Sequence, residues 1–237
     1  MDKREAWCSK KKNVRYVNEA FFEKWSSNMA YVLGFFAADG CLTKNAKRQN
    51  YYVEFVSTDI DILEKIKKVM NAKQRITTKI CSKIHPPTKR GYRIQIGSKK
   101  IFHDLIGLGF SPRKSKSLTF PRIPDQFLAD FTRGYFDGDG CISTGLYKPK
   151  SRKARRSYLL VRFTCGNHNF LKVLSKRLAP NLLGNYGSIF NKNGGLDLSY
   201  SASNGVRLLK YMYLNSGGLH LSRKYDKLID VINRLGP

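Results

Sequence analysis

The hydrophobic and polar positions along the chain predict one series of elements, written twice. Apolar residues recur at helical spacing before Gly40 and again before Gly140, and each predicted helix is followed by two runs rich in β-branched and aromatic residues. An amphipathic helix, two further strand-like runs and a last helix complete each copy. In the first copy the predicted helices span 18–40, 59–71 and 99–109 and the strands 40–45, 51–58, 75–84 and 91–98; in the second the helices span 124–140, 167–179 and 204–217 and the strands 140–147, 157–165, 185–193 and 195–203.

This order, α-β-β-α-β-β-α repeated, predicts an α+β fold with two antiparallel sheets. The strand-like runs alternate apolar residues with Lys, Arg, Gln, Ser or Tyr, which is typical of a sheet with one buried and one solvent-facing side. Residues 111–127 contain three prolines and little apolar periodicity. We therefore expect a first repeat over 1–112 with a helical N-terminal extension, a linker over 113–126, and a second repeat over 127–237.

Charge adds a partner class to this picture. The 237 residues include 44 Lys and Arg against 17 Asp and Glu, a net charge of +27 shared by both halves. Such an excess favours a polyanion, with nucleic acid as the leading candidate. An acidic membrane surface is disfavoured, because the sequence has no long apolar run, signal peptide or basic amphipathic helix. The five cysteines form no C-x-x-C pair, so we expect reduced thiols and an intracellular protein.

Small residues mark one face of each helix that precedes an Asp-Gly pair. Ala30 and Gly34 share a face in the first copy, and Gly134 occupies the equivalent place in the second. Because glycine inside a helix costs about 0.5–1 kcal/mol relative to alanine, these positions predict close packing of the two helices. That packing would bring Asp39 beside Asp139.

Asp39 and Asp139 would each lie at the negative end of a helix, where stability does not favour a carboxylate. Asp-Gly alone is a common turn dipeptide, but its duplication in register favours a site. Two adjacent carboxylates repel each other unless a hard cation such as Mg²⁺ lies between them. Asp137 has Ala37 as its counterpart, so it is not required twice, and we expect it to be peripheral to the catalytic site. Cys41 and Cys141, also in register, are expected to be small buried residues.

The strings "LGFFAADG" and "RGYFDGDG" resemble the signature of the LAGLIDADG homing endonucleases in their single-chain, two-motif form, and the likeness runs from about Val17 to Lys227. This resemblance implies two motif helices at a pseudo-twofold axis and two four-stranded sheets that form a saddle over duplex DNA. It also implies a monomer that makes staggered double-strand breaks by metal-dependent phosphodiester hydrolysis. The implied cofactor is Mg²⁺, although Mn²⁺ or Ca²⁺ could occupy the site.

The resemblance assigns roles only at positions that match the family's motif. It implies Asp39 and Asp139 as metal ligands, the carbonyls of Ala38 and Gly138 as further ligands, Lys114 and Lys224 beside the attacking water or the scissile phosphate, and Asp59 and Asn167 as candidate water-positioning residues. Many relatives use glutamine at these last two positions. Both are equally compatible with a helix N-cap.

Candidate DNA contacts fall into two groups. The exposed strand faces are expected to read base edges in the major groove, and the basic strand connections to contact phosphates. The first group comprises Lys79, Lys83, Arg93, Gln95, Arg162, Tyr200 and Ser201; the second comprises Lys44, Lys47, Arg48, Lys148, Lys150, Arg152, Lys153, Arg155 and Arg156.

Two other functions use the same scaffold. A protein that has lost cleavage, such as a maturase bound to intron RNA or a transcription factor, would be favoured by degenerate motif acids, whereas both acids are present. An additional maturase role stays open. An intein would need a nucleophile at its first residue and an Asn before its terminal nucleophile. The sequence opens Met-Asp-Lys and closes Leu-Gly-Pro, so a free-standing or intron-borne protein is expected.

Overall fold

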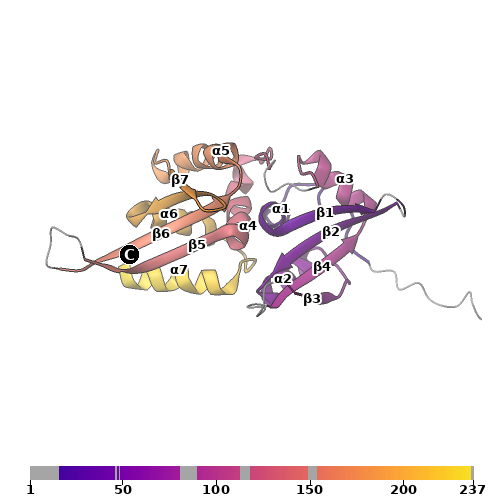
Figure 1. Cartoon of the computed structure of the whole chain (residues 1–237), viewed down its shortest axis with the longest axis horizontal. Helices are drawn as coiled ribbons and strands as arrows, with labels where there is room; N and C mark the ends of the chain where they lie inside the picture. The colour runs from indigo at the N-terminus through magenta and orange to yellow at the C-terminus, as the bar shows by residue number, and fades with distance from the viewer. Residues whose placement is uncertain are drawn as a thin grey trace, which may run out of the picture.

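The computed structural model describes residues 16–45, 47, 49–80, 90–112, 118–148 and 154–235. Two similarly built halves lie side by side, with one helix of each half at the centre (Figure 1). The first half contains α1 (Ser27–Asp39), β1 (Gly40–Asn45), β2 (Asn50–Ser57), α2 (Ile60–Val69), β3 (Ile76–Ile80), β4 (Arg90–Gly97) and α3 (Lys99–Gly107). The second contains η2 (Asp125–Phe127), α4 (Leu128–Asp139), β5 (Gly140–Tyr147), β6 (Arg156–Cys165), α5 (His168–Leu178), η3 (Ala179–Leu182), β7 (Ser188–Lys192), β8 (Gly195–Ser201), α6 (Ala202–Tyr213) and α7 (Ser222–Leu235).

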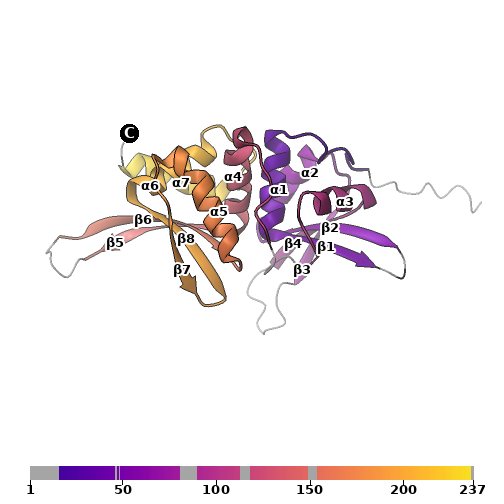
Figure 2. The same ribbon diagram turned by 90° about the horizontal axis from the view of Figure 1, so that it is seen from above.

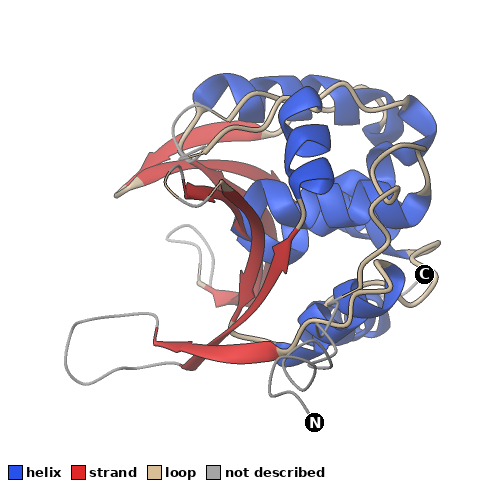
Figure 3. Ribbon diagram, turned by 90° about the vertical axis from the view of Figure 1, so that its right-hand side faces the viewer, coloured by secondary structure: helices blue, strands red, loops and turns tan. Residues whose placement is uncertain are grey.

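Each half has one four-stranded antiparallel sheet, and the two sheets share a topology. The strand orders are β1-β2-β4-β3 and β5-β6-β8-β7. Gly40 pairs with Phe55 in the first sheet, and Gly140 pairs with Phe163 at the equivalent place in the second. The strands lie along one side of the molecule and the helices along the other (Figures 2 and 3). The predicted duplicated α+β fold is confirmed.

The core of each half lies between its sheet and its helices. Val53 and Phe55 on β2, and Val161 and Phe163 on β6, are completely buried. Because strand side chains alternate between faces, the intervening residues point to the other side of the sheet, which we call the open face. One buried and one open face is the arrangement that the alternating sequence predicts.

The N-terminal boundary of α1 differs from the prediction. The helix begins at Ser27, and the hydroxyl of Ser26 accepts a hydrogen bond from the Met29 amide at 3.1 Å, as an N-cap does. The apolar residues before it lie in turns, where Phe21 and Phe22 are buried. Their burial explains why their spacing resembles that of a helix. The expected helical extension at residues 1–15 lies outside the described residues.

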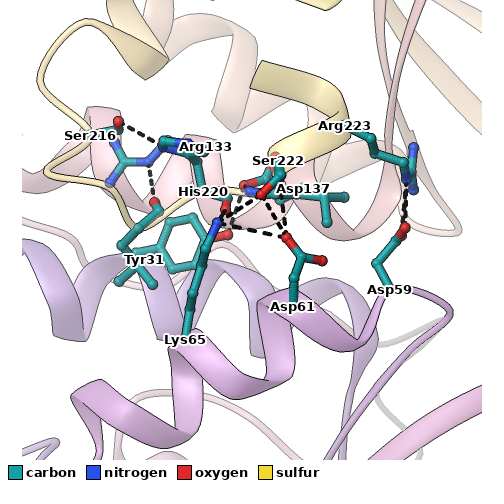
Figure 4. Close-up of polar contacts among 12 residues, drawn as sticks. Tyr31, Asp59, Asp61, Lys65, Arg133, Asp137, Ser216, His220, Ser222 and Arg223 are labelled. Atoms are coloured by element: carbon teal, nitrogen blue, oxygen red, sulfur yellow. Dashed lines mark hydrogen bonds and ion pairs between the residues drawn. The ribbon is translucent and has the colours of Figure 1, made fainter. Parts of the chain in front are cut away.

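The second difference is α7, which the repeat pattern does not contain. It follows α6 after an eight-residue connection and buries Leu228 and Val231. Its first turn reaches the centre of the molecule, where α4 ends (Figure 4). Among the described helices, none has the length and apolar character needed to cross a bilayer.

Candidate active site and nucleic-acid interface

The central helices α1 and α4 approach each other so closely that glycine is required at the crossing. A Cβ atom on Gly34 would lie 2.8 Å from the Tyr135 amide nitrogen and still nearer the Phe131 carbonyl oxygen. One on Gly134 would lie 2.9 Å from the Phe35 nitrogen, and its nearest neighbour would be a carbonyl oxygen of α1. Ala30 is completely buried on the same helix. Backbone therefore meets backbone at this interface.

The closeness of the two helices continues to their C-terminal ends, where Asp39 and Asp139 are the last helical residues. A Cβ atom on Gly138 would clash with the Ala38 side chain and lie 3.1 Å from Asp39 Oδ2. Burial raises the pKa of Tyr135 well above its usual value, and the charges of Asp139 and Asp39 raise it further. Two carboxylates from different repeats thus influence one buried phenol.

The glycines that follow the aspartates have a packing role. The backbone at Gly40 is extended, with φ −89° and ψ 158°, and that at Gly140 is similar. A Cβ atom at either position would collide with the ring of Phe36 or Phe136. These residues do occupy the predicted helix C-caps, but the aromatic ring one turn earlier, and not a left-handed conformation, explains the glycine.

A cavity of about 240 Å³ opens beside Asp39. Its lining includes Ser57 at the end of β2 and Asp59 shortly after it, together with Gly138 of α4 and Arg223 of α7. Arg223 Nε donates to both carboxylate oxygens of Asp59, at 2.9 and 3.0 Å (Figure 4). The cavity therefore combines a motif carboxylate with a cation at its rim.

Lys224 lies next to Arg223 in sequence but is buried, with 3% of its surface exposed. Its ammonium group donates to the carbonyl of Asp137 at 2.8 Å and to that of Phe136. Burial lowers the pKa of Lys224 to about 8, against the opposing charge of Asp137. This lysine binds the C-terminal carbonyls of α4, a position that favours a cation. Its side chain holds the peptide segment that leads into Gly138 and Asp139.

Asp137 is the centre of a buried hydrogen-bond network. It accepts from Tyr31 on α1 at 2.7 Å, from Tyr213 on α6, and from the Leu221 amide at 2.8 Å. Burial raises its pKa above the ordinary value, while the donated hydrogen bonds and the charge of Lys224 oppose that shift. Asp137 therefore connects both motif helices to the segment before α7 (Figure 4). Its side chain is buried and its hydrogen bonds hold helices together, a structural role beside the predicted metal site.

A further polar bridge joins α2 of the first repeat to the start of α7. The Asp61 carboxylate accepts from the Ser222 hydroxyl at 2.8 Å, and Lys65 donates to the His220 carbonyl at 2.7 Å (Figure 4). Because these contacts cross between the repeats, they hold the first turn of α7 beside the cavity.

The two predicted water-positioning residues have different environments. The Asn167 side chain accepts from the amides of Asn169 and Phe170 and therefore caps α5. Asp59 stands at the N-cap position of α2 without making a side-chain cap bond, and its carboxylate binds Arg223 instead. The sequence pattern treats these positions as equivalent, but the structure distinguishes them.

The open face of each sheet carries an arginine beside a carboxylate. In the first sheet Gln95 donates to Glu54 at 2.6 Å, and Arg93 lies 3.6 Å from the same carboxylate. In the second sheet Arg162 donates to Ser143 at 3.0 Å and lies 3.6 Å from Asp197. These arginines and Gln95 are partly exposed on the faces that the alternation predicts.

Tyr200 requires a correction. It was expected on the open face together with Ser201, but it is 2% exposed, and its hydroxyl bonds Ser175 at 3.3 Å. Neighbouring residues of a strand point to opposite faces, so both could not share one. Buried Leu198 lies on the same face as Tyr200 and sets the phase, while Ser201 is exposed.

The remaining predicted residues lie at the surface or outside the described residues. The basic side chains that are exposed in or beside the strand connections are Lys44 on β1, Arg156 at the start of β6, and Lys47, Lys148 and Arg155 between strands. Outside the described residues lie Lys114, Arg48, Lys83, Lys150, Arg152, Lys153 and the side chain of Lys79. Cys41 and Cys141 are exposed, which corrects the expectation that they are buried. Each is the second residue of its strand and lies two residues after a motif aspartate; it faces the open side, since the next residue, Leu42 or Ile142, is buried.

The donors at the helix ends suit a hard divalent cation. Within the described residues there is no group of three or more His, Cys, Asp and Glu side chains that could hold a metal. The donors are two carboxylates with nearby backbone carbonyls, all of them oxygen atoms. Mg²⁺ is commonly held by one or two carboxylates and completes its shell with water and substrate phosphate. The absence of a side-chain at Gly138 leaves room beside Asp39 Oδ2.

Comparison with known proteins supports this fold. Residues 26–107 match the LAGLIDADG-like domain. Most of the chain superimposes on solved LAGLIDADG homing endonucleases, so its two similarly built halves have their fold.

Individual relatives are distant. The homing endonuclease I-ApeI of Aeropyrum pernix is 31% identical over 102 residues, a match that covers 40% of this chain and 45% of that protein's length. I-LtrWI, solved bound to target DNA, has a TM-score of 0.54 at 16% identity and covers 92% of this chain and 91% of that chain. I-AabMI, solved bound to uncleaved DNA, has a TM-score of 0.56 at 17% identity, with 84% and 87% covered.

Proposed function

We propose that this protein is a site-specific homing endonuclease that makes staggered double-strand breaks in a long duplex target. The observation that carries the proposal is the meeting of Asp39 and the Gly138–Asp139 end of α4 at the base of two packed helices. The relatives described above are named as homing endonucleases, and some were solved with DNA. The net charge of +27 supports a polyanionic substrate.

The proposed reaction is hydrolysis of one phosphodiester on each strand. Water oxygen bonds to phosphorus, the bond from phosphorus to the 3′ oxygen breaks, and the leaving oxygen takes a proton. A divalent cation, when bound, would supply positive charge at the phosphate and make a coordinated water more acidic. Asp39 and Asp139 would hold it, with the carbonyls of Ala38 and Gly138 as further donors. We assign Mg²⁺ to this role.

DNA recognition is assigned to the two open faces. Arg93, Gln95 and Arg162 would contact base edges, because arginine reads guanine and glutamine reads adenine in the major groove. Ser201 stands further along the second open face. The exposed lysines and arginines of the strand connections would bind phosphates and make the affinity depend on salt. We further propose that residues 1–112 and 127–237 form the two domains, joined by 113–126, and that one chain acts as a monomer.

A cleavage selection from a randomised duplex library with Mg²⁺ tests this function. We expect a specific cut site that is lost when EDTA removes the metal. Asp39→Asn and Asp139→Asn should each abolish double-strand cleavage while binding to the selected duplex is retained. Asp104→Asn on the remote helix α3 is a matched control that should cut normally. Specific binding by the wild type without any cleavage would instead indicate a silent DNA-binding protein or an RNA maturase.

A further inference from the structure

Each repeat of the sequence carries an adjacent arginine and lysine, Arg113–Lys114 and Arg223–Lys224. The first pair lies outside the described residues and carries none of the argument. In the second pair, α7 directs the two side chains differently, because consecutive residues of a helix do not share a face. The Arg223 side chain is 53% exposed and lines the cavity that contains Asp39, whereas Lys224 is buried under α4.

The ammonium group of Lys224 is already engaged. Two of its three donors are used by the Phe136 and Asp137 carbonyls, and it lies 5.0 Å from the centre of the Phe136 ring. To reach a phosphate in the cavity, Lys224 would have to give up its hydrogen bonds to both carbonyls and leave its buried position under α4. Its position instead fixes the end of α4.

Arg223 differs from Lys224 in its exposure and in how few of its hydrogen-bond donors are engaged by the contact with Asp59. Its Nε–H binds Asp59, which uses one of the five N–H donors of a guanidinium group. A guanidinium can bind two phosphate oxygens at once through its planar edge. The contact with Asp59 restricts the orientation of this side chain at the cavity rim before any substrate arrives (Figure 4).

We propose that Arg223 is a catalytic residue that binds the scissile phosphate on the Asp39 side of the site, with Asp59 and Lys224 as positioning residues. This inference rests on the proposed endonuclease function and refines it. Asp59 orients the guanidinium, and Lys224 orients the helix end that carries Asp139. The family resemblance implies that Lys224 contacts the phosphate directly. In this proposal that role belongs to the neighbouring Arg223.

A purely structural reading of Arg223 is that its ion pair with Asp59 joins the two repeats. Asp61 provides the matched control, because it also joins α2 to the first turn of α7, through Ser222, but does not line the cavity. If linkage between the repeats were the whole role, Asp61→Asn and Arg223→Gln would have the same effect. If Arg223 touches phosphate, only Arg223→Gln would affect one strand selectively.

The test is a single-turnover cleavage assay on a duplex of the selected target with different labels on the two strands. We expect Arg223→Gln to slow one strand by about 100-fold and the other by less than about threefold, so that nicked duplex accumulates. Arg223→Lys should recover part of the rate, since it keeps the charge but not the bidentate geometry. Asp61→Asn should cut both strands at rates within about threefold of wild type.

Equal slowing of both strands by Arg223→Gln, or the same strand bias in Asp61→Asn, would overturn the role of Arg223 while leaving the nuclease intact. A wild-type protein that cuts neither strand under these conditions would overturn the proposed function itself, and this inference with it. Thermal melting of each variant, expected within a few degrees of wild type, separates a local effect from misfolding.

Discussion

Gly34→Ala is expected to damage both stability and activity, because its methyl group would enter the crossing of α1 and α4. The added carbon would lie 2.8 Å from the Tyr135 nitrogen and 2.9 Å from the Phe131 carbonyl carbon, and neither atom belongs to a side chain that can rotate away. Ordinary contacts of this kind are about 3.5 Å or longer, so these two atoms alone require a local separation of about 0.6–0.7 Å, and the Phe131 carbonyl oxygen, which is nearer still, requires more.

Overpacking of this kind costs about 1–3 kcal/mol or more, and the better helix propensity of alanine offsets about 0.5–1 kcal/mol. We therefore expect a loss of about 2 kcal/mol in unfolding free energy. The separation would also move Asp39 relative to Asp139. Since a 1 Å misplacement can cost about 100-fold in rate, a 10- to 100-fold slower cleavage is expected.

Urea denaturation and single-turnover cleavage would measure these two effects. Gly107→Ala is the matched control, since its added Cβ atom would meet nothing within 4 Å and the position is also helical. It should be neutral or slightly stabilising. The reasoning about the helix crossing is refuted if Gly34→Ala is as stable and as active as Gly107→Ala.

Three further predictions follow from the site. Tyr213→Phe removes a donor from buried Asp137 and should lower unfolding free energy by about 1–3 kcal/mol in urea, whereas Tyr186→Phe, at a 66% exposed side chain, should be neutral; equal effects would contradict the network. Because the folded pKa of Lys224 is about 8, below the 10.5 of the unfolded chain, the unfolded state binds more protons in that interval, and stability should rise from pH 8 to 10 more steeply in wild type than in Lys224→Met. Mg²⁺ should raise the melting temperature of the wild type but not of Asp39→Asn, measured by scanning calorimetry with EDTA as the blank; an equal shift would place the ion elsewhere.

The repeated elements could be predicted well because the apolar residues of each helix and strand face one core, between the sheet and the helices of that half. Residues 140–147 are a strand with the predicted bounds, and β4 begins and ends within one residue of its prediction. Periodicity could not separate the helix from the turns before Ser27, since buried aromatic residues in the turns extend the apolar spacing. Among the described residues of the first repeat no helix corresponds to α7, so the duplication of the sequence did not predict it.

The site was harder to predict at residues whose roles depend on packing between helices that are distant in the sequence. The sequence places Lys224 in register with Lys114, but its burial depends on how α7 meets the end of α4. The role of Asp137 likewise depends on Tyr31 and Tyr213, which come from other helices. One signal was present and unused: an arginine precedes the lysine in both repeats.

The central claim is that Asp39 and Asp139, from two repeats, bind one metal centre that acts on DNA. Anomalous scattering from Mn²⁺ in crystals of the protein with its selected duplex tests this claim most directly. We predict an anomalous peak in contact with both carboxylates and a DNA phosphate, and its loss in the Asp39→Asn, Asp139→Asn double variant. A peak that lies away from both aspartates, or that persists in the double variant, would contradict the account.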